Sequence, residues 1–317
     1  MKYDLTQARK CIETLDKRRF DRALLGSGDA FRHIVSLVPL LLHLNHPALP
    51  GYVEDAPAGI ANFILSNYQQ NFLSKEHPEL VEDVQSAVNS DAVFAPILGI
   101  YVMGSFGSIS QTSASDLDIW ICHQDDLSEQ DQQRLAEKTK KISLWASTFH
   151  VEMHFYLMTQ KRFRNERYSD PLTKENSGSA QYMLLLEEFY RSAIRLSGKP
   201  LLWLHLWVED EKQYEAEVSR LVEAGELDPN DWVDFGGLGQ FSASEYFGAS
   251  LWQLYKGIDS PYKSVMKILL LETYAQEYPN AHLIARQFKE DLLSGRSTAA
   301  HHFDPYIAIL EGISQYL

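Results

Sequence analysis

Two aspartates, Asp116 and Asp118, are the side chains of this sequence with the clearest chemical meaning. They lie two positions apart in an apolar segment, and side chains two apart on a β-strand point to the same face. Leu117 and Ile119 then point the other way, into a core. Two adjacent carboxylates repel each other unless a cation lies between them. Hard oxygen ligands on a rigid strand suit Mg²⁺, which completes its coordination with water and substrate phosphates.

The segment before these aspartates is suited to an anion. Gly104 and Ser105 are separated from Asp116 by a spacer of ten residues that is rich in Ser and Gly and carries no charge. Glycine lets the backbone approach a phosphate closely, and serine adds a hydroxyl and a backbone amide. The pattern therefore predicts a phosphate-facing loop, in which Ser113 and Ser115 either contact the phosphate or only shape the loop.

A third acid follows in a segment that alternates like a strand. Between residues 151 and 157 the apolar side chains alternate with Glu152, His154 and Tyr156, which share one face. Glu152 beside the two aspartates would complete a site for two metal ions. The competing interpretation is an acid exposed to solvent. We interpret His154 as a structural histidine rather than a ligand or base.

The elements that must position these side chains form an α+β pattern. Short apolar runs predict strands at residues 97–103, 117–122, 151–158 and 201–206. Apolar residues at helical spacing predict helices at residues 4–44, with a break at Gly26 and Gly28, and at 129–149 and 179–196. Close strand spacing with helices between favours a mixed sheet with flanking helices.

Helical signals dominate after residue 209. Ser242 to Glu245 has the pattern of a capping box ahead of an apolar helix. Ser260 and Pro261 begin another helix, and Asp304 and Pro305 repeat the device before the last one. We therefore predict a catalytic domain with N-terminal helices at residues 1–208 and a helical domain at residues 209–317.

Composition limits the partners. The formal net charge of −14 argues against a nucleic-acid-binding surface, so any basic site is a local pocket that suits a small phosphorylated ligand. No apolar stretch is long enough to span a membrane, and the first ten residues lack the apolar core of a secretory signal. The two cysteines, Cys11 and Cys122, have no metal-binding spacing and favour a reducing cytoplasm.

The order of strand, Gly-Ser, spacer, Asp-x-Asp, helix and acid-bearing strand resembles the nucleotidyltransferase superfamily that includes DNA polymerase β and poly(A) polymerase. The wider sequence is similar to the catalytic region of class I bacterial adenylate cyclases. The segments that carry this similarity lie at residues 21–24, 103–105, 113–120, 187–191, 245–256, 260–263 and 304–306.

The resemblance implies that ATP is converted to 3′,5′-cyclic AMP and pyrophosphate, with two Mg²⁺ or Mn²⁺ ions held by Asp116, Asp118 and Glu152. In related enzymes, basic groups of the helical domain close over the triphosphate. Lys263 and Lys256 are the leading candidates here, with the ordinary solvated lysine as the competing interpretation. The remaining candidates for substrate contacts are Lys267, which shares a helix face with Lys263, the weaker Lys199, and Trp120, which lines the nucleotide pocket or begins a core cluster.

Two other functions share these residues. The same site is expected in a nucleotidyltransferase that moves AMP to a protein or small-molecule acceptor, and in an inactive nucleotide-binding regulatory module. Three carboxylates argue against the inactive module, and the absence of a basic groove argues against an RNA acceptor. The resemblance also implies a regulatory C-terminal region, or regulatory proteins, outside this chain.

Overall fold

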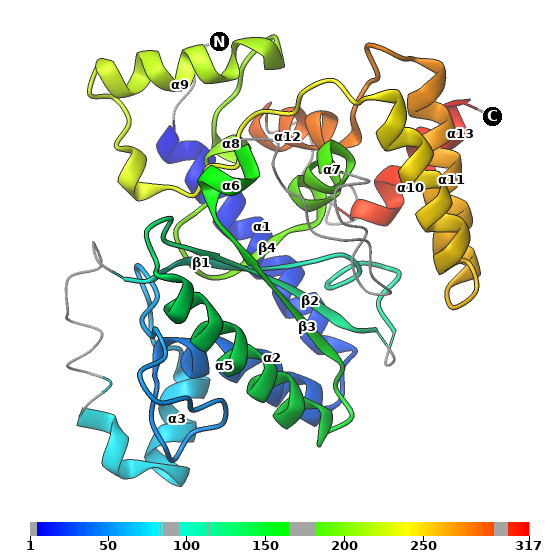
Figure 1. The fold of residues 1–317 in the computed structure, drawn as a ribbon. Coiled ribbons are helices and arrows are strands. Elements are labelled where there is room, and N and C mark those ends of the chain that lie inside the picture. The colour runs from blue at the N-terminus through cyan, green and yellow to red at the C-terminus, as the bar shows by residue number, and fades with distance from the viewer. Residues whose placement is uncertain are drawn as a thin grey trace.

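A four-stranded mixed sheet lies at the centre of the computed structural model, which describes residues 5–82, 84, 95–112, 115–164, 182–294 and 304–316 (Figure 1). The strand order is β3-β2-β1-β4. β1 (Ile97–Met103) is antiparallel to both β2 (Leu117–His123) and β4 (Ile194–Gly198), whereas β2 is parallel to β3 (Met153–Met158). The α+β class and the mixed sheet are confirmed, together with the first three strands.

The fourth strand is not where the sequence predicts it. Residues 201–206 contain a short helix, α8 (Leu202–His205), and β4 occupies the end of the helix expected at residues 179–196. The helix α7 (Tyr182–Ser192) stops two residues before β4. Gly198, at φ +92°, ends the strand against Gly99 of β1, where a Cβ atom would lie 2.5 Å from the Gly99 Cα. Tertiary pairing with β1 therefore overrides the apparent helical spacing.

Helix α5 (Glu129–Ser147) connects β2 to β3. Two parallel neighbours need a crossover connection, and this helix supplies it. It begins at Ser128, whose side chain accepts a hydrogen bond from the Asp131 amide. The crossover sets Asp118 opposite His154 in the register of β2 and β3, so the polar faces of both strands meet.

Both faces of the sheet are covered. Ile100, Val102 and Ile119 pack with helices on one side of the sheet, and Figure 1 shows α2 (Asp29–His43), α3 (Asn67–Glu76) and α5 below it. The other helices of this region are α1 (Leu5–Leu25), which crosses behind the sheet, and the short η1 (Pro78–Leu80). The predicted N-terminal helices and the break between them are confirmed.

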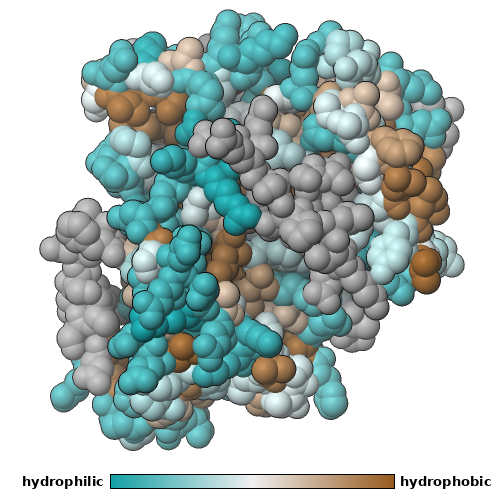
Figure 2. Space-filling model, viewed as in Figure 1, coloured by the Kyte–Doolittle hydropathy of each residue, from teal (hydrophilic) through white to brown (hydrophobic). Residues whose placement is uncertain are grey.

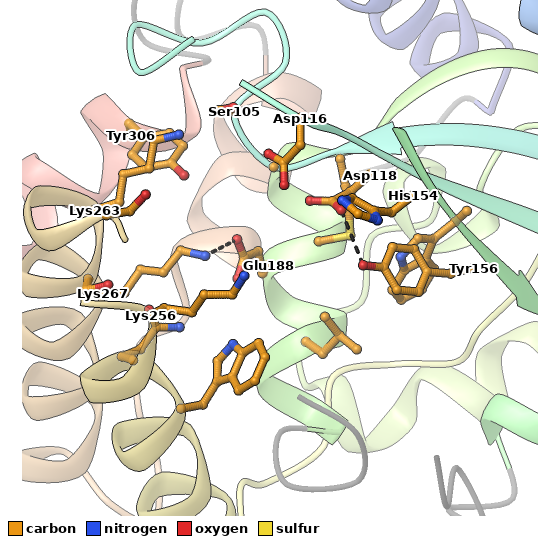
Figure 3. Close-up of a pocket in the computed structure, with 18 residues that line it drawn as sticks. Ser105, Asp116, Asp118, His154, Tyr156, Glu188, Lys256, Lys263, Lys267 and Tyr306 are labelled. Atoms are coloured by element: carbon orange, nitrogen blue, oxygen red, sulfur yellow. Dashed lines mark hydrogen bonds and ion pairs between the residues drawn. The ribbon is translucent and has the colours of Figure 1, made fainter. Parts of the chain in front are cut away.

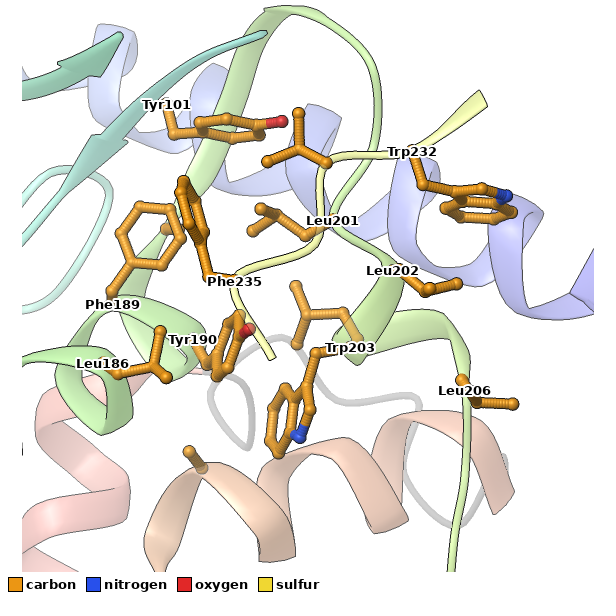
Figure 4. Close-up of a cluster of buried hydrophobic side chains, with 14 of the residues drawn as sticks. Tyr101, Leu186, Phe189, Tyr190, Leu201, Leu202, Trp203, Leu206, Trp232 and Phe235 are labelled. Carbon is orange, nitrogen blue, oxygen red and sulfur yellow. The ribbon is translucent and has the colours of Figure 1, made fainter. Parts of the chain in front are cut away.

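The other face of the sheet packs on an aromatic cluster (Figure 4). Tyr190 stacks on Trp203 with ring centroids 4.3 Å apart, and Trp120 stacks on Phe189 at 4.1 Å. Stacked rings bury a large apolar area and fix the angle between elements. The short elements around this cluster are α6 (Gln160–Arg164), η4 (Glu211–Gln213), α9 (Tyr214–Glu223) and η5 (Pro229–Asp231).

Within the described residues, four longer helices follow along the chain. They are α10 (Ala243–Lys256), α11 (Pro261–Gln276), α12 (Ile284–Ser294) and α13 (Pro305–Tyr316). The predicted capping box of Ser242 and Glu245 is present with both of its hydrogen bonds. The predicted starts at Pro261 and Pro305 are also confirmed.

The division predicted near residue 208 does not coincide with a change of core. Leu221, Trp232 and Phe235 lie in the same hydrophobic cluster as Trp203. A different cluster, built from α10, α11 and α13 and the start of α12, includes Phe241. By packing, the segment between α8 and α10 therefore belongs with the sheet.

An apolar strip lies on the surface at the C-terminal helices. Hydrophobic side chains gather along the edge where α10 and α11 lie (Figure 2). The large exposed apolar residues there are Phe247, Leu251, Leu254, Tyr255, Ile258, Tyr262 and Val265. Among the described helices, none is both long and apolar enough to cross a membrane. Cys11 and Cys122 are free thiols.

Candidate active site

The predicted aspartates and lysines meet in one pocket between the sheet and the C-terminal helices (Figure 3). Asp116 and Asp118 form one wall. Lys256, Lys263 and Lys267 approach from α10 and α11 on the opposite wall. Residues far apart in the sequence therefore place negative and positive charge on two sides of a single cavity.

The aspartate wall is set by strand geometry. Asp118 pairs with Met103 of β1 and with His154 of β3. The Tyr156 hydroxyl donates to Asp118 Oδ1 at 3.3 Å. Burial, and after it the neighbouring charge of Asp116, raise the pKa of Asp118 to about 6. A bound cation would stabilise both carboxylates in their charged form.

These two carboxylates fit a divalent cation. They are hard oxygen donors on one strand face, the arrangement in which Mg²⁺ keeps water ligands and takes substrate phosphate oxygens. No group of three or more His, Cys, Asp or Glu side chains that could hold a metal ion occurs in the part of the chain that the structure describes. The residues therefore fit one ion directly, and the expected second ion remains a prediction.

Glu152, the predicted third ligand, lies outside this pocket. Its side chain is 73% exposed and pairs with His154 Nε2 at 3.2 Å. It lines a neighbouring cavity together with Arg22 and Gly107. Glu152 precedes β3, an edge strand, so its side chain is free to turn to solvent. The structure does not bring it to the aspartate pair.

The lysine wall contains one fixed ion pair. Lys267 Nζ lies 2.6 Å from Glu188 Oε1 of α7. Burial alone would lower the pKa of Lys267, but the charge and hydrogen bond of Glu188 together with Tyr306 outweigh burial and raise that pKa. Lys263 differs, because burial lowers its pKa and the Asp116 charge only opposes that shift. Lys256 Nζ lies 5.4 Å from the ring centroid of Trp252.

Gly104 and Ser105 line the pocket at the end of β1. Gly104 has φ +83°, a conformation that favours glycine, and a Cβ there would lie 3.7 Å from Asp118 Oδ2. Its amide donates to Ser192 Oγ at 3.1 Å, so this N–H already has a protein acceptor. Ser105 is buried beside it and is the nearer candidate for a phosphate contact.

The chain matches two families described as "Adenylate cyclase NT domain", over residues 4–204, and "Adenylate cyclase, class-I, second domain", over residues 241–317. The chain belongs to the class-I adenylate cyclase family. The gap between these two matches falls in the segment that joins α8 to α10. Both walls of the pocket therefore come from matched regions, the aspartates from the first and the lysines from the second.

Relatives within this family are similar along the whole chain. Adenylate cyclase of Haemophilus influenzae is 67% identical over all of this chain, and that of Pasteurella multocida is 61% identical over all of it. Adenylate cyclase of Escherichia coli K12 is 43% identical over 96% of the chain. The chain spans 38% of the length of the first two relatives and 36% of the third.

A solved structure of spectinomycin adenyltransferase from Enterococcus faecialis, with ATP and spectinomycin, is also similar in part. It matches 75% of this chain and 98% of its own, at 13% identity and a TM-score of 0.34. At this level the similarity carries no argument about the site of the adenylate cyclase family member described here.

Two of the other predicted contacts, Lys199 and Ser115, lie outside the pocket. Lys199 follows β4, and its amide pairs with Leu98 near the start of β1, whereas the pocket lies at the other end of that strand. Ser115 Oγ accepts from the Thr112 amide at 2.9 Å and lines the neighbouring cavity. Ser113 lies outside the described residues.

Trp120 lies both at the pocket and in the aromatic core, the two positions considered for it. It borders the pocket, but it is 2% exposed and its ring stacks on Phe189. A face covered by another ring is not available to a nucleotide base, so its packing role is the one the geometry supports. Trp252 on the lysine wall is the more accessible indole.

Sequence reasoning missed several pocket residues. Tyr156 carried a signal, because it shares the strand face of His154 and follows it by two positions. Glu188 carried none, since it resembles any acid of an amphipathic helix. The neighbouring acid, Glu187, pairs instead with Arg191, and its carboxylate lies 3.1 Å from the guanidinium.

Proposed function

We propose that this chain binds ATP in the pocket and converts it to 3′,5′-cyclic AMP and pyrophosphate. One observation carries the proposal: two carboxylates and three lysines face each other across a single cavity. A nucleoside triphosphate with its divalent cation has the complementary charge pattern. Membership of the class-I adenylate cyclase family supports cyclisation over other reactions of ATP.

The bond changes are simple. The ribose 3′-oxygen forms a bond to the α-phosphorus, the bond from that phosphorus to the bridging oxygen of pyrophosphate breaks, and the 3′-hydroxyl proton is released. Mg²⁺ or Mn²⁺ held by Asp116 and Asp118 would lower the pKa of the 3′-hydroxyl and neutralise developing phosphate charge. We assign no separate general base.

The protein's own groups act mainly by position and charge. The Tyr156 hydroxyl orients the Asp118 carboxylate. Lys263 and Lys256 neutralise the leaving pyrophosphate from the opposite wall, and Lys263 is the stronger candidate because it lies close enough to the aspartates for Asp116 to act on its pKa. Glu188 holds Lys267 in place, which fixes that wall of the pocket.

The test is product formation without an acceptor. Purified chain is incubated with ATP and Mg²⁺ or Mn²⁺, and the products are separated by chromatography. Cyclic AMP and pyrophosphate in equal amounts support the proposal. AMP attached to a protein would instead indicate AMP transfer. A folded chain that binds ATP but forms no product would instead indicate an inactive nucleotide-binding module. The same assay on Asp118→Asn tests the pocket itself. Asp126→Asn, at an exposed aspartate outside the pocket, is its matched control.

The longer relatives suggest where regulation enters. This chain spans 38% of the Haemophilus influenzae relative. We infer that inputs tuning the activity act through the region beyond the match, or through proteins that bind there. Comparing the activity of the chain with that of the longer polypeptide tests this inference.

A further inference from the structure

The loop that follows Gly104 is tied to helix α1. Gly107 has φ +68°, and a Cβ there would lie 2.6 Å from the Arg19 carbonyl oxygen, so only glycine allows this approach. Arg22 Nε donates to the Gly107 carbonyl at 2.7 Å. The Gln111 side chain accepts from the Gly107 amide at 2.7 Å and donates to the Ala23 carbonyl at 3.1 Å. The side chains of Arg22 and Gln111 therefore hold the loop against the end of α1.

Asp304 ties the same loop to helix α13. Its side chain is fully buried. Oδ1 accepts from the Tyr306 amide at 2.9 Å, which caps the start of α13. Oδ2 accepts from the Ile109 amide at 2.7 Å and from the Arg22 guanidinium. One carboxylate thus joins the two segments, at residues 21–24 and 304–306, that mark the ends of the family resemblance.

This junction lies directly behind the pocket. The loop that it fixes begins with Gly104 and Ser105, and the Ser108 amide and hydroxyl donate to the Ser105 carbonyl at 3.0 and 2.7 Å. Tyr306, two residues after Asp304, lines the pocket near Lys263 and Lys267 (Figure 3). A shift of Asp304 would therefore move both Ser105 and Tyr306.

We propose that Asp304 and Arg22 form a positioning pair that holds Ser105 and Tyr306 at the phosphate end of the pocket. This proposal rests on the function proposed above. A Gly- and Ser-rich loop has much conformational freedom, and reaction rate depends on the loop being ordered before the nucleotide binds. A fully buried carboxylate with a guanidinium partner supplies that order, because loss of the guanidinium would leave the buried charge of Asp304 without its counter-charge.

Asp304→Asn separates this role from simple helix capping. Asn is as good an N-cap as Asp, so its amide oxygen keeps the hydrogen bond from Tyr306. The amide nitrogen that replaces Oδ2 cannot accept from Ile109 or from Arg22. Arg22→Met breaks the pair from the other side and leaves the cap of α13 untouched. Arg220→Met, in an exposed pair with Glu217, is the matched control.

The experiment combines hydrogen exchange with kinetics on the 317-residue chain. In both Asp304→Asn and Arg22→Met we expect amides of residues 105–111 to exchange about 10-fold faster or more, while amides of α13 keep their protection. We expect kcat to fall on the order of 100-fold with KM for ATP changed less than about 3-fold. The kcat of the double variant should be no lower than that of either single variant, because both substitutions break the same Asp304–Arg22 pair.

Two results would overturn the proposal. One is unchanged exchange in residues 105–111 in both variants. The other is a loss of activity that simply follows the unfolded fraction, with kcat per folded molecule equal to that of Arg220→Met. If the wild-type chain forms no cyclic AMP but the variants still lose loop protection, the proposed function fails while the positioning pair stands.

Discussion

Lys267 and Glu188 join helix α11 to helix α7 at one wall of the pocket, with Nζ and Oε1 2.6 Å apart. Neither side chain is more than 22% exposed. The pair lies 79 residues apart in the sequence. It fixes the lysine-bearing helix to the element that leads into β4 and so relates one wall of the pocket to the sheet.

Breaking this pair should destabilise the fold. Lys267→Met leaves the Glu188 carboxylate buried with less compensation, and we expect a loss of about 3 kcal/mol in the free energy of unfolding. Lys267→Met combined with Glu188→Leu should recover most of that loss, since no charge then remains unpaired. Urea unfolding measures both. Arg220→Met, at an exposed pair, should leave stability nearly unchanged. Equal losses in the single and double variants would contradict this account.

Substitution of Asp116 or Asp118 should lower activity far more than substitution of Glu152, the third predicted ligand. We expect Asp116→Asn and Asp118→Asn to lower kcat/KM by about 1000-fold, since each removes a charged ligand of the expected cation. Glu152→Gln should stay within about 3-fold of the wild type, because its side chain lies in a different cavity. Initial rates at saturating Mg²⁺ decide the matter. A loss for Glu152→Gln as large as that for Asp118→Asn would restore Glu152 as a ligand.

The lysines should rank by their position on the wall. Lys263→Met is expected to lower kcat/KM for ATP by about 100-fold, as for loss of one group that stabilises transition-state charge. Lys256→Met should lower it less, because its ammonium lies over the Trp252 ring. Lys140→Met, an exposed lysine on α5, is the control and should leave the rate unchanged. A rate for Lys263→Met equal to the control would remove it from the site.

Lys138 should make stability depend on pH. It is 1% exposed, donates to the Leu44 carbonyl at 2.7 Å, and burial lowers its pKa from 10.5 to about 8. Between these values the unfolded chain binds the proton and the folded chain does not, so stability rises with pH. Relative to Lys138→Met, the wild type should gain up to roughly 1.4 kcal/mol per pH unit from pH 8 to 10. Urea unfolding of both proteins at pH 7.5 and 9.5 tests this, with Lys140→Met correcting for the rest of the chain. A constant difference would contradict it.

Removal of divalent cations should abolish activity and leave the fold intact. Asp116 and Asp118 lie on a strand with hydrophobic residues on its other face, so the sheet does not depend on a metal. We expect no product with EDTA and full recovery on addition of Mg²⁺ or Mn²⁺, and an unchanged circular dichroism spectrum. Undiminished turnover in excess EDTA would refute the metal assignment.

The part of the site that lies on β2 was predictable from the sequence. The alternation of Asp116 and Asp118 with Leu117 and Ile119 predicts that the two carboxylates share a face. In the structure both carboxylates line the same pocket. Lys263 and Lys267 lie four positions apart on the helix that begins at Pro261, so their shared face was also predictable. Such local patterns predict the direction in which each side chain points, because strand and helix periods are fixed by backbone geometry.

The rest depended on tertiary contacts. Glu152 fits the strand alternation, but it lies just before an edge strand, where nothing compels its side chain to face inward. The residues of β4 have helical spacing in the sequence. They form a strand because Gly198 packs against Gly99 of β1. The partner of Glu188 is set by how α11 packs on α7, and no short-range pattern records it.

The order of the two pocket walls along the chain has a consequence for synthesis. Asp116 and Asp118 are synthesised before α10 and α11, which carry the lysines, and before α13, which carries Tyr306. Because folding proceeds from the N-terminus during translation, the aspartate wall can form before the wall that faces it exists. The pocket is therefore complete only after α13 has been synthesised.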